Sequence, residues 1–185
     1  MDVTTWHLEQ TDPADLIPAK PPRMQVDVVR SEVPSPEFAR FLYTAVGGDW
    51  HWTTRLPWTR RQWLAWLDRP GLETWVAWHR GTPAGYVQLE SQPDGVVEIT
   101  NFGLLPYAIG HGVGGHLLHA GASRAWDIHL RWPGREPTRR VWVHTCSLDG
   151  PAALSNYKAR GFRLFKTEVK QEDVADTPPG PWPGA

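Results

Sequence analysis

The chain has 185 residues, of which 41% are hydrophobic and 21% charged, a length that favours one domain with a real core. Its formal net charge of -1 includes no basic surplus, so we expect neither nucleic acid nor a membrane as partner. A single cysteine, a start without signal-peptide features and no apolar run near the ~20 residues of a membrane span favour a cytoplasmic protein.

The elements in chain order predict a mixed α/β domain. Alternating β-branched and aromatic residues mark strands, and apolar residues three or four apart between capping residues mark helices. The predicted strands span residues 24–32, 74–79, 84–90, 96–105, 140–145 and 163–169. The predicted helices begin at Pro36, Arg60, His116 and Pro151 and end near residues 46, 69, 130 and 160. This order indicates a central sheet flanked by helices.

The two ends of the chain differ from its middle in composition. Residues 1–23 carry several prolines and little periodicity, so we predict a proline-rich N-terminal arm. From Asp176 to Ala185 the chain is rich in proline and glycine, and we predict a flexible C-terminal tail over residues 171–185. The folded domain is therefore expected over residues 24–170.

The stretch from Val96 to Gly115 joins a strand pattern to a helical pattern through a glycine-rich turn. Pro106 ends the strand, because its ring fixes φ and it has no N–H to give to a sheet. The glycines that follow are Gly110, Gly112, Gly114 and Gly115. Bare backbone N–H groups at a helix N-terminus bind phosphate. The loop therefore predicts a site for a phosphate-bearing ligand.

Two kinds of nucleotide-binding loop fit this stretch poorly. The Gly-Lys-Ser/Thr of a Walker A loop is absent. The letters Gly-x-Gly-x-x-Gly do occur at Gly110, Gly112 and Gly115, which leaves a dinucleotide-binding oxidoreductase as a less favoured alternative. That motif normally follows the first strand of its fold and precedes an acid at a strand end. Here several strands come first, and the nearest acid, Asp127, falls inside the predicted helix.

Two segments together resemble one protein family. A strand ending in Leu104-Leu105-Pro106, followed by Gly112-Val113-Gly114 at a helix start, resembles the signature of the GNAT superfamily of acyl-CoA-dependent N-acetyltransferases. Ile109 stands where that family usually has Arg or Gln. A second segment, Val141 to Phe162, resembles the family's next strand and helix, which end in Tyr-x-x-x-Gly-Phe. The resemblance covers residues 24–169.

The resemblance implies both a fold and a cosubstrate. The expected fold is a mixed central sheet of six to seven strands with about four flanking helices and a splayed central strand pair that admits acetyl-CoA, the acyl donor. The strand would pair its backbone with the pantetheine arm, and the glycine loop would wrap the pyrophosphate. The residues that the resemblance assigns to acetyl-CoA are Phe102, Gly103, Leu104, Leu105, Ile109, Gly110, His111, Gly112, Val113, Gly114, Gly115 and Asn156.

The resemblance also suggests catalytic groups. Tyr157 matches the tyrosine that often protonates the departing thiolate; the alternative is a buried tyrosine that packs the last helix on the sheet. Glu98 is the candidate general base, with a water chain to solvent as the alternative. Strand alternation predicts that Glu98 shares a face with Thr100, Phe102 and Leu104. A backbone N–H near Leu104 would polarise the thioester carbonyl.

Other reactive side chains receive structural interpretations. His144 and Cys146 lie two apart on a strand, but no third group orients them as a nucleophile pair, so we expect core packing. His116 and His119 lie three apart on one helix without an evident third ligand, so no metal site is predicted.

The acceptor site is the least defined part of the sequence. In the family that this chain resembles, the first two helices and their loop usually form one wall of it. Asp49, Trp50, Trp52 and Trp58 lie in that region. Tryptophan faces attract cations, and Asp49 could pair with an ammonium, so these residues are the candidate acceptor site. Trp63 and Trp66, at helical spacing, are expected in the core.

These observations predict an N-acetyltransferase. It would move an acetyl group from acetyl-CoA to a primary amine of a small molecule or peptide by direct attack on the thioester, as a monomer or homodimer. An alternative from another class is a non-catalytic acyl-CoA-binding module of the same fold.

Overall fold

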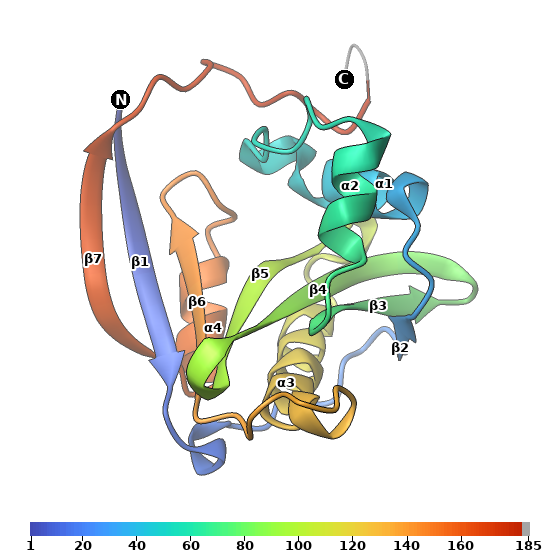
Figure 1. Ribbon diagram of the computed structural model, residues 1–185. Helices are drawn as coiled ribbons and strands as arrows, with labels where there is room; N and C mark the ends of the chain where they lie inside the picture. The colour runs from blue at the N-terminus through green and yellow to red at the C-terminus, as the bar shows by residue number, and fades with distance from the viewer. Residues whose placement is uncertain (183–185) are drawn as a thin grey trace.

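Seven strands form one sheet in the computed structural model, which describes residues 1–182 (Figure 1). Their order across the sheet is β2-β3-β4-β5-β6-β1-β7, and neighbours are antiparallel except for β5 and β6, which are parallel. The strands are β1 (Asp2–Gln10), β2 (Asp27–Ser31), β3 (Leu72–His79), β4 (Thr82–Gln92), β5 (Val96–Leu104), β6 (Arg140–Cys146) and β7 (Arg163–Gln171). The helices are α1 (Pro36–Gly47), α2 (Arg60–Leu67), α3 (Val113–Trp126) and α4 (Ala153–Ala159). This is the mixed sheet with flanking helices that the sequence predicted.

The prediction of an N-terminal arm is wrong for residues 2–10. They form β1, which pairs with β6 on one side and with β7 on the other. Trp6 and Leu8 point to one face, where Leu8 is fully buried, and His7 points to the opposite face. This apolar and polar alternation is a strand pattern, and the prolines that suggested an arm begin only at Pro13.

The C-terminal segment after β7 has no regular secondary structure among the residues described. It runs back toward α1, where the Gly180 N–H donates to the Gly48 carbonyl at 3.0 Å. The predicted flexible tail also includes residues 183–185, which lie outside the described residues.

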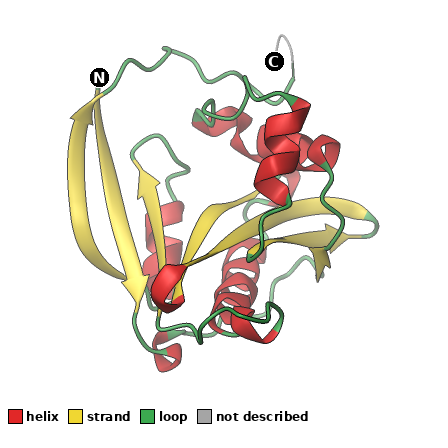
Figure 2. Cartoon of the chain, viewed as in Figure 1, coloured by secondary structure: helices red, strands yellow, loops and turns green. Residues whose placement is uncertain are grey.

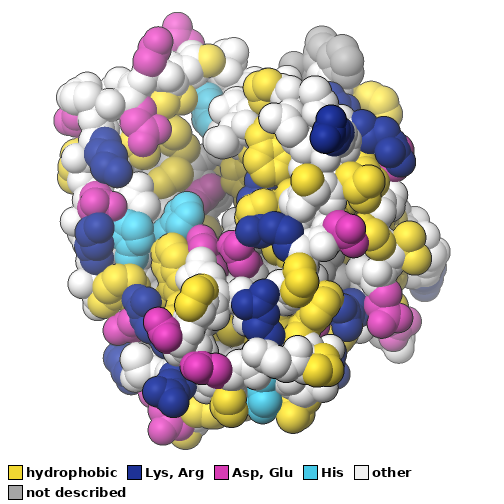
Figure 3. All heavy atoms as spheres, in the orientation of Figure 1, with side chains coloured by type: hydrophobic (Ala, Val, Ile, Leu, Met, Phe, Trp, Pro, Cys, Tyr) yellow, Lys and Arg dark blue, Asp and Glu magenta, His cyan; other side chains and the backbone are white. Residues whose placement is uncertain are grey.

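Helices cover the two faces of the sheet unequally (Figure 2). On one face, α3 and α4 enclose the main core, in which Leu118 and Ala122 of α3 lie with Val87 of β4. On the other face, α1 and α2 cover the part around β3 and β4, where Leu42 packs with Val76. No helix among residues 1–182 covers this second face over β6, β1 and β7, and we call that part the open face. Figure 3 shows it hollowed between the α1–α2 layer and the β1–β7 pair.

The parallel strands β5 and β6 separate along their length. Their ladder runs from Val96 opposite Arg140 to Ile99 opposite Val143, and β5 then continues to Leu104 with no further β6 partner. The strands therefore diverge toward the end that leads into α3. We call the opening the β5–β6 notch.

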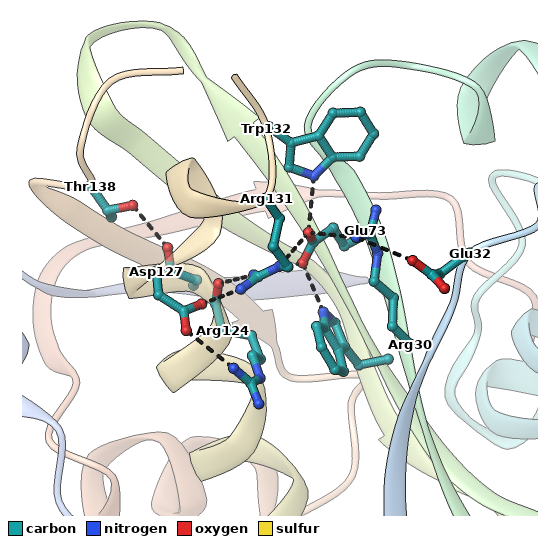
Figure 4. Close-up of polar contacts among 10 residues, drawn as sticks. Arg30, Glu32, Glu73, Arg124, Asp127, Arg131, Trp132 and Thr138 are labelled. Atoms are coloured by element: carbon teal, nitrogen blue, oxygen red, sulfur yellow. Dashed lines mark hydrogen bonds and ion pairs between the residues drawn. The ribbon is translucent and has the colours of Figure 1, made fainter. Parts of the chain in front are cut away.

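A buried cluster of charged and aromatic side chains anchors the connection after α3 to the sheet (Figure 4). The Glu73 side chain on β3 has no exposed surface, and its two oxygens accept hydrogen bonds from Arg131 Nε at 2.7 Å and Nη2 at 2.9 Å. Trp75 Nε1 and Trp132 Nε1 donate to the same carboxylate at 2.8 and 2.9 Å. Arg131 also pairs with Asp127. Two donors on each oxygen offset the cost of burying the charge of Glu73.

Candidate functional site

The backbone of β5 presents polar groups to the β5–β6 notch. Leu105 donates its N–H to the Ala84 carbonyl of β4 at 2.9 Å. Because successive residues of a strand direct their backbone groups to opposite sides, the Leu104 N–H is directed away from β4 and toward the notch. A donor in this position can stabilise negative charge on a carbonyl oxygen placed there.

The glycine-rich loop ends in the uncapped N-terminus of α3. Gly110 and Gly112 adopt φ of 84° and 81°, the left-handed conformation that glycine allows at no steric cost. Gly112 is the N-cap residue and offers no side chain to the helix. The N–H groups of Val113, Gly114 and Gly115 make no hydrogen bond with residues 1–182, since His116 is the first to bond, to the Gly112 carbonyl. Free N–H groups and the helix dipole favour an anion here.

Side chains of α4 and of its C-cap residue, Arg160, flank this loop. A Cβ on Gly114 would lie 3.6 Å from Asn156 Nδ2, and a Cβ on Gly115 would lie 3.6 Å from Arg160 Nη1. Arg160 Nε is buried and has no hydrogen-bond partner among the described residues. An unpaired cationic group beside free backbone N–H groups fits a phosphate, so the residues present suit the pyrophosphate of acetyl-CoA.

The segment between β1 and β2 also contacts the loop. Arg23 donates its guanidinium to the Gly110 carbonyl and its backbone N–H to the His111 carbonyl. Pro22 lies so close to Gly112 that a Cβ added there would be 3.2 Å from the Pro22 Cα. This packing explains why a glycine is needed at the helix start, beyond its φ angle. The Ile109 side chain, by contrast, is exposed.

Tyr157 of α4 lies beside the notch. Its ring packs edge-on against Phe102 and Phe162, with centroids 5.8 and 6.1 Å apart, and the residue is 4% exposed. Burial, and next the charge of Asp149, raise the pKa of Tyr157 well above its usual value. The phenol is therefore protonated at neutral pH. Its hydroxyl makes no hydrogen bond with residues 1–182. The hydroxyl oxygen is not fully buried, so it reaches solvent.

A bulge in β5 reverses the predicted orientation of Glu98. The register between β4 and β5 shifts at this point, so that Thr100 is an extra residue without a partner of its own. After the bulge, Phe102 and Leu104 pack against the main core, whereas Glu98 lies on the open face. The prediction that Glu98 shares a face with Phe102 and Leu104 is therefore wrong.

Glu98 lies in a polar environment that favours its protonated form. Its side chain is 14% exposed, accepts a hydrogen bond from Gln92 Nε2 at 2.8 Å and lies 3.8 Å from His144 Nε2. Burial, followed by the charge of Glu90, raises the pKa of Glu98, while the Gln92 hydrogen bond and the charge of Arg55 oppose the rise. A carboxylate with a raised pKa is a stronger base than an ordinary one.

The expectation of core packing is wrong for His144. Its side chain is 48% exposed on the open face, and its ring lies 5.9 Å from that of His7 on β1. Partial burial and the charge of His7 lower the pKa of His144. Cys146 is half-buried at the end of β6, and no hydrogen bond joins it to His144 in the part of the chain described. His144 thus lies between Glu98 and solvent.

The predicted acceptor residues do not form one cluster. The Trp52 indole N–H donates to Asp149 Oδ1 at 3.3 Å, which ties the α1–α2 loop to the loop after β6. The Trp50 ring packs near Gly150 in the same loop, where an added Cβ would lie 3.4 Å from Trp50 Cζ2. Asp49 is exposed and forms no ion pair with any described residue. Trp50 and Trp52 therefore border the end of the notch, and Asp49 lies outside it.

An arginine lies over the tryptophan faces that were expected to bind a ligand cation. The Arg55 Cζ is 4.1 Å from the Trp66 ring centroid and 5.2 Å from that of Trp58. Trp63 is 2% exposed, as expected of a core residue. Trp66 is only partly buried and donates its indole N–H to Gln88 Oε1 at 3.0 Å. The tryptophan cluster therefore holds a cation of the protein itself.

Sequence reasoning did not identify Arg55, Arg160 or Arg23. Arg160 could have been found, because it stands one helical turn after Asn156 and directly before the Gly-Phe pair of the second motif. Nothing in the local sequence marks Arg55 or Arg23, since both depend on contacts with distant segments.

Other features of the described residues add no site of this kind. A cavity of about 160 Å³ between β2, α1 and α2 contains none of the predicted site residues. Among residues 1–182 no three His, Cys, Asp or Glu side chains are grouped as metal ligands would be. Within the same residues, every helix is too short or too polar to cross a membrane.

Solved structures share this fold. A GCN5-related N-acetyltransferase from Kribbella flavida superposes with a TM-score of 0.60 over 90% of this chain and 56% of its own, at 19% identity. A second, from Sphaerobacter thermophilus, gives 0.63 over 90% and 50%, at 17% identity. A tandem GNAT protein from the clavulanic acid biosynthesis pathway gives 0.53 over 93% and 55%, at 18% identity. The chain thus spans only about half the length of these structures.

At sequence level, no curated protein matches the chain significantly. A family model does match it, over residues 36–162, which include α1, the glycine-rich loop and α4. The match spans more than half of the chain and the whole of the notch. The chain belongs to the acetyltransferase (GNAT) family.

Proposed function

We propose that this chain is an acetyl-CoA-dependent N-acetyltransferase that acts on a primary amine of a small molecule. The observation that carries the proposal is the separation of β5 from β6 directly beside the uncapped N-terminus of α3. An extended ligand can lie along the free β5 edge while its anionic end binds the helix N-terminus.

Acetyl-CoA supplies the acetyl group as an activated thioester. Val113, Gly114 and Gly115 offer their backbone N–H groups to the pyrophosphate, and Arg160 adds a positive charge next to them. Arg160 thereby takes over the electrostatic task of the Arg or Gln that the family usually has at the position of Ile109. The Leu104 N–H donates to the carbonyl oxygen as that oxygen gains negative charge.

Acid and base lie on opposite faces of the sheet at the notch. Glu98, on the open face, accepts the proton of the attacking amine as the new N–C bond forms, and His144 passes that proton to solvent. Tyr157, on the α4 side, donates its hydroxyl proton to sulfur as the C–S bond breaks. The products are the N-acetylated amine and the free thiol, and solvent restores the tyrosine proton.

Binding and turnover test this proposal separately. In a thermal melt, acetyl-CoA at ~100 times its dissociation constant adds about 2.7 kcal/mol to stability, a rise in Tm of roughly 5–10 °C for a chain of this size. NAD serves as the control ligand. Free-thiol release is then measured with acetyl-CoA and a panel of amines.

We expect stabilisation by acetyl-CoA alone and thiol release that depends on an amine. Stabilisation by NAD alone would refute the proposal and favour a dinucleotide-binding protein. Stabilisation by acetyl-CoA with no thiol release across the panel would favour a non-catalytic acyl-CoA-binding module instead.

A further inference from the structure

Arg55 lies on the α1–α2 side of the β5–β6 notch, the side on which we expect the acceptor amine to bind. It belongs to the loop between α1 and α2, and its Nη1 donates to Asn101 Oδ1 at 2.8 Å and to Gln88 Oε1 at 3.2 Å. Asn101 is in the part of β5 that has already separated from β6. The guanidinium is also stacked on Trp66, so its position is fixed from two directions.

Arg55 has no direct carboxylate partner within the described residues. Other arginines near this side of the sheet have carboxylate partners: Arg69 pairs with Glu90 at 2.7 Å, and Arg140 pairs with Glu9. Arg55 forms no ion pair with any carboxylate of residues 1–182, and both of its hydrogen-bond partners are neutral amides. Burial lowers the pKa of Arg55, a sign that the cation has lost much of its water. A partly desolvated cation without a direct ion-pair partner favours an anionic ligand.

The hydrogen-bond donors of Arg55 show how such a ligand would bind. Nη1 carries two hydrogens, and both are used by Asn101 and Gln88. Nε and Nη2 make no hydrogen bond with residues 1–182, and neither is among the buried polar atoms without a partner, so both reach solvent. Together they form the side-on edge of the guanidinium, which matches the two oxygens of a carboxylate.

The surrounding charges favour a carboxylate that is part of a zwitterion. Glu98 and Glu90 lie close enough to Arg55 for their charges to affect its neighbourhood, and His144 lies beyond Glu98. Carboxylates at this site repel a doubly charged phosphate more strongly than a singly charged carboxylate, and they attract the ammonium group of an amine that is still protonated. A ligand with one carboxylate and one amine satisfies both charges.

We propose that the acceptor is an amine that also carries a carboxylate, as an amino acid does, and that Arg55 binds this carboxylate side-on through Nε and Nη2. The carboxylate is held on the α2 side of the notch, and the amine is directed toward Glu98. This inference rests on the proposed acetyltransferase function and specifies its substrate class. Arg55 is a binding residue in this scheme.

Matched pairs of acceptors test the proposal without any variant. Each pair is an amino acid and the amine obtained from it by decarboxylation: phenylalanine with phenethylamine, tryptophan with tryptamine, and lysine with cadaverine. For the best pair, we expect kcat/KM to be on the order of ten- to hundredfold higher for the acid, the usual range for hydrogen bonds to charged groups. A wild-type protein that uses the amines as well as the acids overturns the inference.

Variants then assign the preference to Arg55. In Arg55→Met, KM for the acid rises by the same factor while KM and kcat for the decarboxylated amine stay within about twofold, because only the carboxylate contact is lost. Arg55→Lys retains the positive charge but lacks the two parallel N–H donors of the guanidinium, so it recovers only part of the preference for the acid. Arg60→Met, which removes an exposed arginine paired with Glu37 at the start of α2, is the control and keeps the wild-type preference.

The outcomes separate the two proposals. If Arg55→Met lowers kcat/KM equally for the acid and for its decarboxylated amine, Arg55 has a structural role and the inference is overturned. Stabilisation by acetyl-CoA without turnover of either pair member also overturns it. Should Arg55→Met not fold, the wild-type pairs and Arg55→Lys decide alone. Absence of both stabilisation by acetyl-CoA and turnover would refute the acetyltransferase function itself.

Discussion

The buried carboxylate of Glu73 offers the sharpest test of what holds this sheet and its connections together. Glu73→Gln keeps the shape of the side chain but replaces one acceptor oxygen by an NH₂ group. Each oxygen of Glu73 accepts one hydrogen bond from Arg131 and one from a tryptophan indole (Figure 4). Whichever oxygen is replaced, two donors then face a third donor.

The expected loss follows from these contacts. A hydrogen bond to a charged group contributes about 1.5–3 kcal/mol, and a buried donor left without an acceptor costs about 1–3 kcal/mol. Two such bonds are lost, so the bonds alone give about 3–6 kcal/mol. This agrees with the total cost of about 3–5 kcal/mol for breaking one side of a buried ion pair. At roughly 2–4 °C per kcal/mol for a chain of this size, the Tm should fall by roughly 6–20 °C.

Chemical and thermal unfolding measure this loss, and the chain provides a matched control. Glu32 lies 3.9 Å from the same Arg30 that approaches Glu73 at 3.6 Å, but its side chain is 77% exposed. Glu32→Gln should therefore change the free energy of unfolding by less than about 1 kcal/mol. If Glu73→Gln and Glu32→Gln lower the free energy of unfolding equally, the burial of Glu73 and its four hydrogen-bond donors do not explain its contribution to stability.

Three further substitutions test the catalytic scheme. Glu98→Gln should lower kcat on the order of 10²–10⁴-fold and remove the acid limb of the pH–rate profile. Since the folded state raises the pKa of Glu98, its ionised form destabilises the fold as pH rises through that pKa, so this variant should not lose stability at neutral pH. Tyr157→Phe should lower kcat on the order of 10²-fold and leave the Tm within about 1 °C, because its hydroxyl has no partner among the described residues. Arg160→Met should raise KM for acetyl-CoA on the order of tenfold and leave KM for the amine unchanged.

Each of these predictions has its own refuting result. A Glu98→Gln variant that keeps its acid limb would shift the role of base to a water chain. An unchanged kcat in Tyr157→Phe would show that Tyr157 only packs α4 on the sheet and is not the general acid. A rise in both Michaelis constants of Arg160→Met would indicate a general disturbance of α4.

The sequence predicted the glycine-rich loop and its helix because their determinants are local. Pro106 ends the strand, and the glycines leave the next N–H groups bare. The helix follows as expected, although α3 begins at Val113, three residues before the predicted start at His116. The order of the strands and helices after residue 24 also followed from local periodicity and caps. These features need no knowledge of distant residues.

The features that the sequence did not reveal depend on distant or subtle contacts. The partners of β1 are β6 and β7, more than a hundred residues away in sequence. The bulge at Thr100 adds one residue to a strand whose composition does not change, and that alone turned Glu98 to the other face. The acceptor groups of Arg55 lie 33 and 46 residues further along the chain. Local patterns carry no signal for such contacts.

The place of β1 inside the sheet sets an order of events during synthesis. Residues 2–10 are synthesised well before both of their pairing partners, residues 140–146 and 163–171, which lie more than a hundred residues further along the chain. Pairings of such long sequence separation form late, because a long loop must close before any contact compensates for it. Among residues 1–182, β7 pairs only with β1, so residues 2–10 must wait for residues 163–171 before that edge of the sheet can exist.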